Sequence, residues 1–244
     1  MNDVRAEVGV EAEAAALVVR DWGGIVWQGE GDDGAAESSV APLSALPGSL
    51  RRRLGSFERA VVQAVLGVAR PQRATRITLG SRYGNLAGTG RILQELAVSE
   101  LPSPTLFSHS VLNAACGVAD QIRNDRSSHS AISAGAGTLA AALTDTWLQL
   151  QDSGGVSDGT DDGSEAVIVL ADLPLPTIYG DLDPAWDMGL CVGMRVALAD
   201  GHVDSGAGRA AGHPLGRSGY GALLDGLRTG GRFLGFTGGR WSVA

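Results

Sequence analysis

Residues 104–150 read PTLFSHSVLNAACGVADQIRNDRSSHSAISAGAGTLAAALTDTWLQL, and this stretch decides the fold class. The spacing of its apolar residues predicts a helix, a tight connection, a short buried strand and a second helix. Residues 133–137, SAGAG, lie at the corner between the strand and the second helix. In many α/β enzymes a nucleophile occupies such a corner, because the N–H groups and dipole of the following helix stabilise negative charge. This corner contains no cysteine.

Strands and helices alternate along the rest of the chain. Apolar runs and alternating patterns predict strands at 17–27, 76–80, 166–171 and 190–198. Helical spacing predicts helices at 50–70, from Asn85 onward with Leu86, Leu93 and Leu96 as anchors, and at 215–227. Glycine, serine and aspartate mark loops at 28–48, 151–165 and 200–214. This interleaving predicts an α/β fold with a layered sheet.

The charge of the chain limits its partners. The 244 residues carry a formal net charge of −8, and all 19 basic residues are arginine. Nucleic acids and anionic membranes attract cationic surfaces, so neither is expected as a partner. The lack of lysine excludes Walker-type phosphate binding, Schiff-base chemistry and a lysine general base. We interpret the basic run Arg51–Arg53 as a solvated or salt-bridged surface.

The sequence shows no targeting or membrane segment. No apolar run approaches the roughly 20 residues that span a bilayer, so membrane insertion is not expected. The first 16 residues are acidic and lack the basic and apolar regions of a secretory signal. We therefore expect a cytoplasmic protein that begins with a flexible acidic leader at 1–16.

Cysteines, histidines and glycine motifs give no metal or cofactor signature. Cys116 and Cys191 lie among apolar residues, which predicts two buried free thiols in a reducing compartment. The histidines lack partners at ligand spacing and are interpreted as structural; they are His109, His129, His202 and His213. Glycine motifs at 155–159 and 206–212 lack the flanking strand and helix that a nucleophile elbow or phosphate loop requires. Neither a metal nor a cofactor is expected.

The central stretch resembles the nucleophile region of the β-ketoacyl synthases, condensing enzymes with the thiolase fold. Residues 80–84, GSRYG, resemble the turn that ends the second core strand in that family. Residues 104–107 and 110–117 resemble its dimer-interface segment and the helix with an asparagine that follows. Residues 128–134 resemble the strand that carries the nucleophile to its corner. In this register the catalytic cysteine of the family corresponds to Gly135.

Four stretches are similar to short β-ketoacyl synthase-like N-terminal proteins, which are similar to chain-length factors encoded beside aryl-polyene-type polyketide synthases. These stretches are 50–60, 78–97, 103–117 and 171–180. The resemblance implies a thiolase-like N-terminal half, a layered α/β sheet, with the second catalytic half missing. It divides the chain into the leader at 1–16, this domain at 17–200 and a C-terminal loop and helix extension at 201–244.

The resemblance implies a subunit without condensing chemistry, because Gly135 has no side chain that could carry an acyl group. It implies a heterodimer with an active β-ketoacyl-ACP synthase, whose acyl pocket the chain helps to shape for a substrate on acyl carrier protein. In the family the strand before the corner pairs with its twofold mate, so a lone copy would expose a strand edge. Interface candidates are Phe107, Ser110, Asn113, Ala114, Ala115 and Gly117; channel candidates are Gly84, Ala87 and Arg91.

Two alternatives stay open. The first is a weak acyltransferase or thioesterase that uses Ser133, Cys116 or His129. The second is a freestanding acyl-binding homodimer that has no synthase partner.

Overall fold

The computed structural model describes residues 15–27, 34–98, 101–152, 164–179, 189–199, 213–214, 219–237 and 240–244. One mixed sheet forms its centre, with strand order β4-β3-β5-β6-β1-β8-β9-β7, and β2 also pairs with β1. The strands are β1 Ala15–Trp27, β2 Ala35–Ser38, β3 Arg76–Gly80, β4 His129–Ile132, β5 Glu165–Asp172, β6 Gly189–Leu198, β7 His213–Pro214, β8 Phe233–Thr237 and β9 Arg240–Val243. The α-helices are α1 Gly48–Arg53, α2 Ser56–Val68, α3 Leu86–Ala97, α4 Pro104–Ser110, α5 Ala114–Arg123, α6 Thr138–Asp152 and α7 Tyr220–Arg228.

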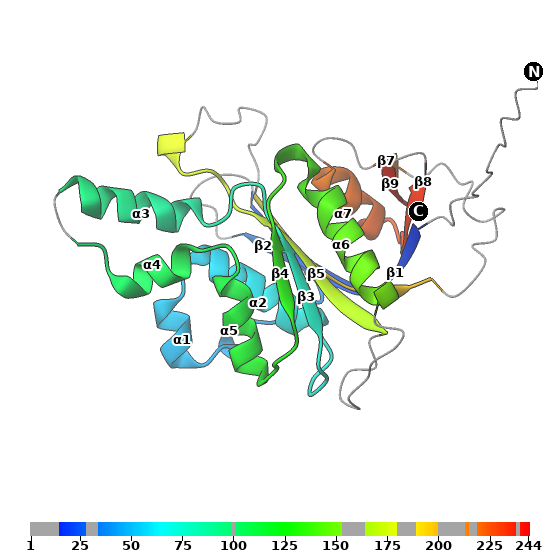
Figure 1. Cartoon of the computed structure of the whole chain (residues 1–244), viewed down its shortest axis with the longest axis horizontal. Helices are drawn as coiled ribbons and strands as arrows, with labels where there is room; N and C mark the ends of the chain where they lie inside the picture. Colours follow the sequence, from blue (N-terminus) through cyan, green and yellow to red (C-terminus); the bar gives the residue numbers. More distant parts are fainter. Residues whose placement is uncertain are drawn as a thin grey trace, which may run out of the picture.

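Helices cover both faces of the sheet (Figure 1). In β5, Ile168 and Leu170 pack in a core with α6 and α7, whereas Val167 and Val169 pack in a second core with α2 and α5. An uninterrupted apolar run is the pattern of a strand that is covered on both faces. The predicted layered α/β sheet is therefore confirmed.

Strand direction brings the corner at 133–137 to one edge of the sheet. β3 pairs in parallel with both β4 and β5, so these three strands end on the same side. The other long pairings are antiparallel, between β5 and β6 and between β6 and β1. The residues that follow β3, β4 and β5 consequently lie close together.

Several elements differ from the sequence prediction. The predicted helix at 50–70 is two helices, because Leu54 adopts an extended conformation between α1 and α2. The predicted loop at 28–48 contains β2, which pairs with β1. The predicted buried strand is β4, which is only partly buried because it lies at the end of the sheet next to β3. Leu93 and Leu96 are predicted to anchor α3, but both are exposed. The buried apolar side chain of this helix is Ile92.

The C-terminal residues also contribute to the sheet. α7 confirms the predicted small helix, although it begins at Tyr220. β8 pairs with β1, and β9 with β8, so the expected loop and helix extension includes strands. At the other end, β1 begins at Ala15, inside the expected leader. Residues 1–14, the motifs at 155–159 and 206–212, and His202 lie outside the described residues. Within the described segments, no helix is long and apolar enough to cross a membrane.

The close approach of α2 to β6 depends on Gly193. A Cβ atom at this position would lie 2.9 Å from the carbonyl oxygen of Ala64 in α2. We expect Gly193→Ala to lower the free energy of unfolding by roughly 1–3 kcal/mol, because the helix must move away from the sheet. Urea unfolding measures the change.

Gly221→Ala is the matched control for this substitution. Gly221 lies in α7, where an added Cβ would meet no atom within 4 Å. Alanine has the higher helix propensity, so this variant should be up to about 1 kcal/mol more stable than the natural chain. Equal losses of stability in the two variants would contradict the packing argument.

Candidate functional site

The corner at 133–137 lies where β3, β4 and β5 end (Figure 1). It follows β4, forms a 3₁₀ turn at Gly135–Gly137 and leads into α6. Thr138 fixes the start of α6: its Oγ1 donates to the Gly135 carbonyl oxygen at 2.8 Å and accepts from the Ala134 N–H at 3.0 Å. The predicted strand-to-helix corner is present.

A buried carboxylate holds the neighbouring strand ends. Asp172, at the end of β5, is fully buried. It accepts hydrogen bonds from Ser81 Oγ at 2.8 Å and from the N–H groups of Arg82 and Tyr83 at 2.9 and 3.0 Å. Ser81 Oγ in turn accepts from the Gly84 N–H at 2.7 Å. The turn at 81–84 is thereby fixed to the end of β5.

Tyr220 connects this cluster to the C-terminal part of the chain. It is buried at the start of α7 and is a further hydrogen-bond partner of Asp172. Burial raises the pKa of Asp172, and the hydrogen bonds from Arg82, Tyr83, Ser81 and Tyr220 partly offset that rise. Burial and the charge of Asp172 also raise the pKa of Tyr220. The phenol of Tyr220 therefore stays protonated at neutral pH.

Gly135 is open to its surroundings. Its φ of +54° lies in the left-handed region, and an added Cβ would meet no atom within 4 Å. A shallow depression beside it is lined by Arg82, Thr138 and Tyr220 among others, and no water-sized molecule fits inside. Position 135 itself therefore supplies no nucleophilic side chain, and the depression beside it has no room for a substrate.

The two cysteine thiols are unsuited to nucleophilic chemistry. Cys116 is buried in α5, where burial and the nearby charge of Asp120 raise its pKa to about 12. Burial raises the pKa of Cys191 in β6 as well, with a further contribution from Asp172. A thiol that stays protonated at neutral pH is a poor nucleophile. The predicted buried free thiols are confirmed.

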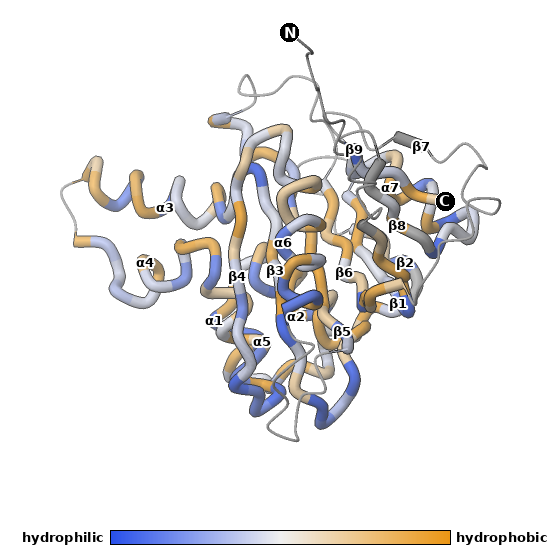
Figure 2. Tube along the Cα trace, turned by 45° about the vertical axis from the view of Figure 1, so that its right-hand side comes forward, coloured by the Kyte–Doolittle hydropathy of each residue, from blue (hydrophilic) through white to orange (hydrophobic). Residues whose placement is uncertain are grey.

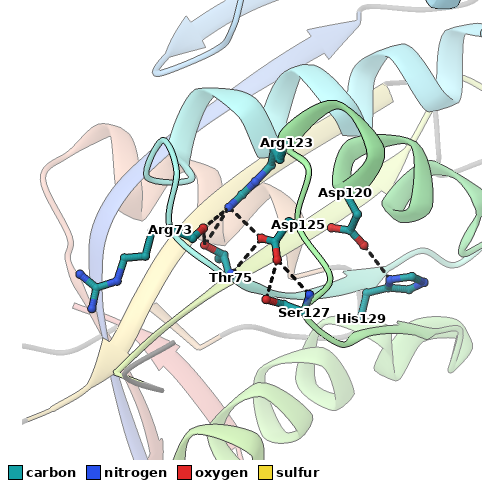
Figure 3. A network of polar contacts seen from close by, with 7 residues as sticks. All are labelled: Arg73, Thr75, Asp120, Arg123, Asp125, Ser127 and His129. Carbon is teal, nitrogen blue, oxygen red and sulfur yellow. Dashed lines mark hydrogen bonds and ion pairs between the residues drawn. The ribbon is translucent and has the colours of Figure 1, made fainter. Parts of the chain in front are cut away.

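Ser133 and His129 belong to separate hydrogen-bond networks. Ser133 Oγ is exposed and donates to the carbonyl oxygen of Arg82 at 3.3 Å. His129 Nδ1 lies 2.9 Å from Asp120 Oδ2 (Figure 3). A serine nucleophile needs a base within hydrogen-bond reach, and this histidine is engaged elsewhere. Among the described residues, no group of three His, Cys, Asp or Glu side chains could hold a metal ion.

The Asp120–His129 pair lies beside a structural cluster that fixes β4 (Figure 3). Arg123, at the end of α5, donates to the Arg73 carbonyl at 2.6 Å and to Thr75 Oγ1 at 2.9 Å. It also forms an ion pair with Asp125 at 3.1 Å. Asp125 accepts from the Thr75 N–H, so the connection before β4 is tied to the start of β3.

The predicted interface residues divide into exposed and buried ones. Phe107 on α4 is 60% exposed, and Asn113 and Gly117 are also exposed. Ser110 and Ala114 are half-buried. Ala115 is 1% exposed and packs in the core beneath α5. The Ala115 side chain thus faces the core of this chain, and the interface assignment of all six residues stays a prediction.

Most exposed apolar side chains lie on α3 and α4. These helices and their adjoining residues, 86–98 and 101–111, are here called the arm, which projects from the body of the molecule (Figure 1). Figure 2 shows hydrophobic segments along both helices. The large apolar side chains exposed on the arm are Leu93, Leu96, Val98, Leu101, Phe107 and Val111. Outside the arm only Leu148 and Ile178 are comparably exposed among the described residues. Exposed apolar patches of this kind mark interaction surfaces.

Two channel candidates, Ala87 and Arg91, lie on the arm, and the third, Gly84, lies just before it. Gly84 has a φ of +64° in the turn after β3, and Ala87 is exposed in the first turn of α3. Arg91 lies one turn further along α3 and lines a cavity with α1 and α2. The structure therefore places Arg91 at a polar site that the sequence did not indicate.

Sequence reasoning missed Asp172 and Tyr220. Asp172 directly follows the buried run of β5, and a carboxylate at the end of a covered parallel strand is a usable signal. Tyr220 lies 48 positions later, so its contact with Asp172 depends on how α7 packs against the sheet. No local sequence pattern predicts the contact between Tyr220 and Asp172.

The sequence matches a known family model over most of its length. The model describes the β-ketoacyl synthase N-terminal domain and matches residues 25–213. No curated protein matches the chain.

Three solved structures share the fold. A chain in the complex of the ketosynthase ApeO with its chain length factor ApeC from Xenorhabdus doucetiae has a TM-score of 0.61 at 23% identity, covering 76% of this chain and 80% of that one. The ishigamide ketosynthase/chain length factor has a TM-score of 0.56 at 11% identity, covering 77% and 63%. A β-ketoacyl synthase from Burkholderia phymatum STM815 has a TM-score of 0.51 at 10% identity, covering 76% and 60%. The chain thus spans less than two thirds of the last two.

The raised pKa of Asp172 predicts a pH dependence of stability. A carboxyl group with a higher pKa in the folded state binds its proton more tightly there, so folding loses stability as pH rises through that pKa. The free energy of unfolding of the natural chain, relative to Asp172→Asn, should fall as pH rises above about 4, by at most ~1.4 kcal/mol per pH unit. Denaturant unfolding at several pH values measures this difference.

Asp225→Asn is the control, because Asp225 is an exposed carboxylate on α7. Curves for the natural chain and Asp172→Asn that stay parallel from pH 4 to 8 would show that burial does not perturb Asp172.

Proposed function

The chain belongs to the β-ketoacyl synthase N-terminal domain family, and from this premise we propose that it is a non-catalytic, chain-length-factor-like subunit. Its partner in this proposal is an active β-ketoacyl-ACP synthase, with which it forms a heterodimer. The chain helps to shape the acyl pocket of that partner during polyketide- or fatty-acid-type chain elongation. Acyl carrier protein presents the growing chain to the pair.

The observation that carries this proposal is the geometry of Gly135. The strand-to-helix corner is intact, yet the residue at its open position has no side chain. Condensation requires a covalent acyl-enzyme, and a glycine cannot form one. Both cysteine thiols lie elsewhere, are buried and have raised pKa values, so neither supplies the missing thiolate at position 135.

Two surfaces support pairing with another subunit. β4 is an edge strand whose described partner is β3 alone, and such an edge promotes association unless it is covered. The arm exposes a group of large apolar side chains near the same end of the sheet. Both features favour a protein partner over a monomer in water.

Two of the structural neighbours agree with this choice of partner. One describes a ketosynthase bound to its chain length factor, and the other a ketosynthase/chain length factor. A homodimer of this chain would cover the same two surfaces. A measurement of mass in solution distinguishes the homodimer from the heterodimer with a synthase.

We expect the tagged full chain to form a one-to-one complex when it is expressed with the full-length ketosynthase encoded nearest to it. Phe107→Arg should dissociate this complex, because it places a charge in the apolar surface of the arm. Size-exclusion chromatography with light scattering measures the masses.

Leu148→Arg is the matched control for this variant. Leu148 lies on α6 and is 53% exposed, close to the 60% of Phe107, so the added charge and size are equivalent. A stable monomer or homodimer that does not bind the synthase would contradict the proposal. Loss of the complex in both variants would exclude the arm as its specific contact.

The absence of catalysis has its own test. Ser133→Ala should leave the condensation rate of the pair unchanged, since Ser133 Oγ contacts only a backbone carbonyl in the described residues. Substituting the active-site cysteine of the synthase partner should abolish the rate. A rate that falls 100-fold in Ser133→Ala would support the acyltransferase or thioesterase alternative.

A further inference from the structure

A polar cavity of about 430 Å³ lies where α1, the start of α2, α3 and α4 meet. Figure 1 shows α1, α3 and α4 on the same side of the molecule. The volume falls within the range of small-molecule sites, roughly 300–1,000 Å³. It is separate from the corner at 133–137, with which it shares no lining residue.

Positive charge is concentrated around this cavity although the chain as a whole is acidic. Four arginines line it, namely Arg52, Arg53, Arg59 and Arg91. Glu58 is the one carboxylate among the lining residues, so the wall has a formal excess of three positive charges. The net charge of the whole chain is −8. Arg52 and Arg53 are exposed, as expected for a solvated surface, and they also line this cavity.

Three buried polar atoms at this cavity have no hydrogen-bond partner among the described residues. They are Glu58 Oε2, Arg59 Nε and His109 Nδ1. Glu58 is 2% exposed, and its other oxygen, Oε1, accepts from Asn85 Nδ2 at 3.0 Å. A buried polar atom without a partner destabilises the fold, so a ligand that supplies partners binds favourably. Arg59 Nε can donate a hydrogen bond to a ligand, and Glu58 Oε2 can accept one.

The start of α2 adds donors to the same cavity. Gly55 is the N-cap residue and provides no side-chain hydrogen bond to the first N–H groups of this 13-residue helix. Gly55 and Ser56 both line the cavity. The first N–H groups and the dipole of α2 favour negative charge at this position, and Glu58 in the first turn lies beside Gly55.

We propose that this cavity binds an organic phosphate ester. The phosphate group lies against the start of α2 and accepts hydrogen bonds from the arginine guanidinium groups, which match phosphate geometry. A hydroxyl or amide of the organic part donates to Glu58 Oε2. The cavity is too large for an inorganic phosphate ion alone, and the buried position of the unpartnered atoms suits a small ligand better than an acidic protein surface.

The test is isothermal titration of the full chain with glycerol 3-phosphate, in a phosphate-free buffer and without the ketosynthase. We expect saturable binding at one site, tighter than that of inorganic phosphate, which lacks carbon-bound hydroxyl groups. Arg59→Gln and Arg91→Gln should each weaken binding about tenfold, as expected for loss of one charge-assisted hydrogen bond. Thermal unfolding confirms that both variants remain folded.

Arg51→Gln is the matched control, because Arg51 lies in α1 beside Arg52 yet does not line the cavity. Its affinity should equal that of the natural chain. Absence of glycerol 3-phosphate binding, or equal weakening in Arg51→Gln, would overturn the proposal. Binding of a glutamate-rich peptide without binding of glycerol 3-phosphate would overturn it too. This result is independent of the proposed function, since no synthase is present.

Discussion

The hydrogen bonds to the buried Asp172 carboxylate are the constraint on which the functional end of the molecule depends. Burying a charged carboxylate is unfavourable unless donors surround it. Here the donors come from the turn after β3 and from α7, so one group joins the end of β5, that turn and the C-terminal helix. The Ser81 N–H in turn donates to the Ile132 carbonyl of β4 at 3.0 Å. The position of the corner at 133–137 therefore depends on Asp172, a residue 35 to 39 positions later in the chain.

The arm combines two surfaces of opposite character. Leu93 and Leu96 on α3 face solvent, whereas Arg91 of the same helix lines the cavity with α1 and α2. α4 likewise carries the exposed Phe107 and the cavity-lining His109. An anion in the cavity would contact both the arm and the body, because arginines from α1, α2 and α3 surround it. Such a contact would fix the direction in which the apolar surface of the arm is presented to a partner.

The sequence predicts the covered elements well and the edges poorly. β5 is an unbroken apolar run, and β3 and β6 carry apolar residues at alternate positions, so their own side chains identify these strands. β2, with the sequence AAES, and the short β8 and β9 have no such pattern, because pairing with β1 or with each other forms them. For the same reason Leu93 and Leu96 were assigned to a core: helical spacing indicates an apolar face without indicating what covers it. The corner at Gly135 followed from a local motif, whereas Asp172, Tyr220 and the arginine cavity required contacts between distant segments.

The backbone conformation of Gly135 suits glycine better than cysteine, the residue that carries the chemistry in the family. A residue other than glycine with φ near +54° is strained, by roughly 1–2 kcal/mol. A cysteine at this corner would carry that strain as the cost of exposing its thiol to substrate, and a glycine removes it. The surrounding hydrogen bonds of Thr138 and Asp172 do not involve the side chain at 135. Under the proposed function, a glycine at position 135 therefore leaves the corner intact and avoids this strain.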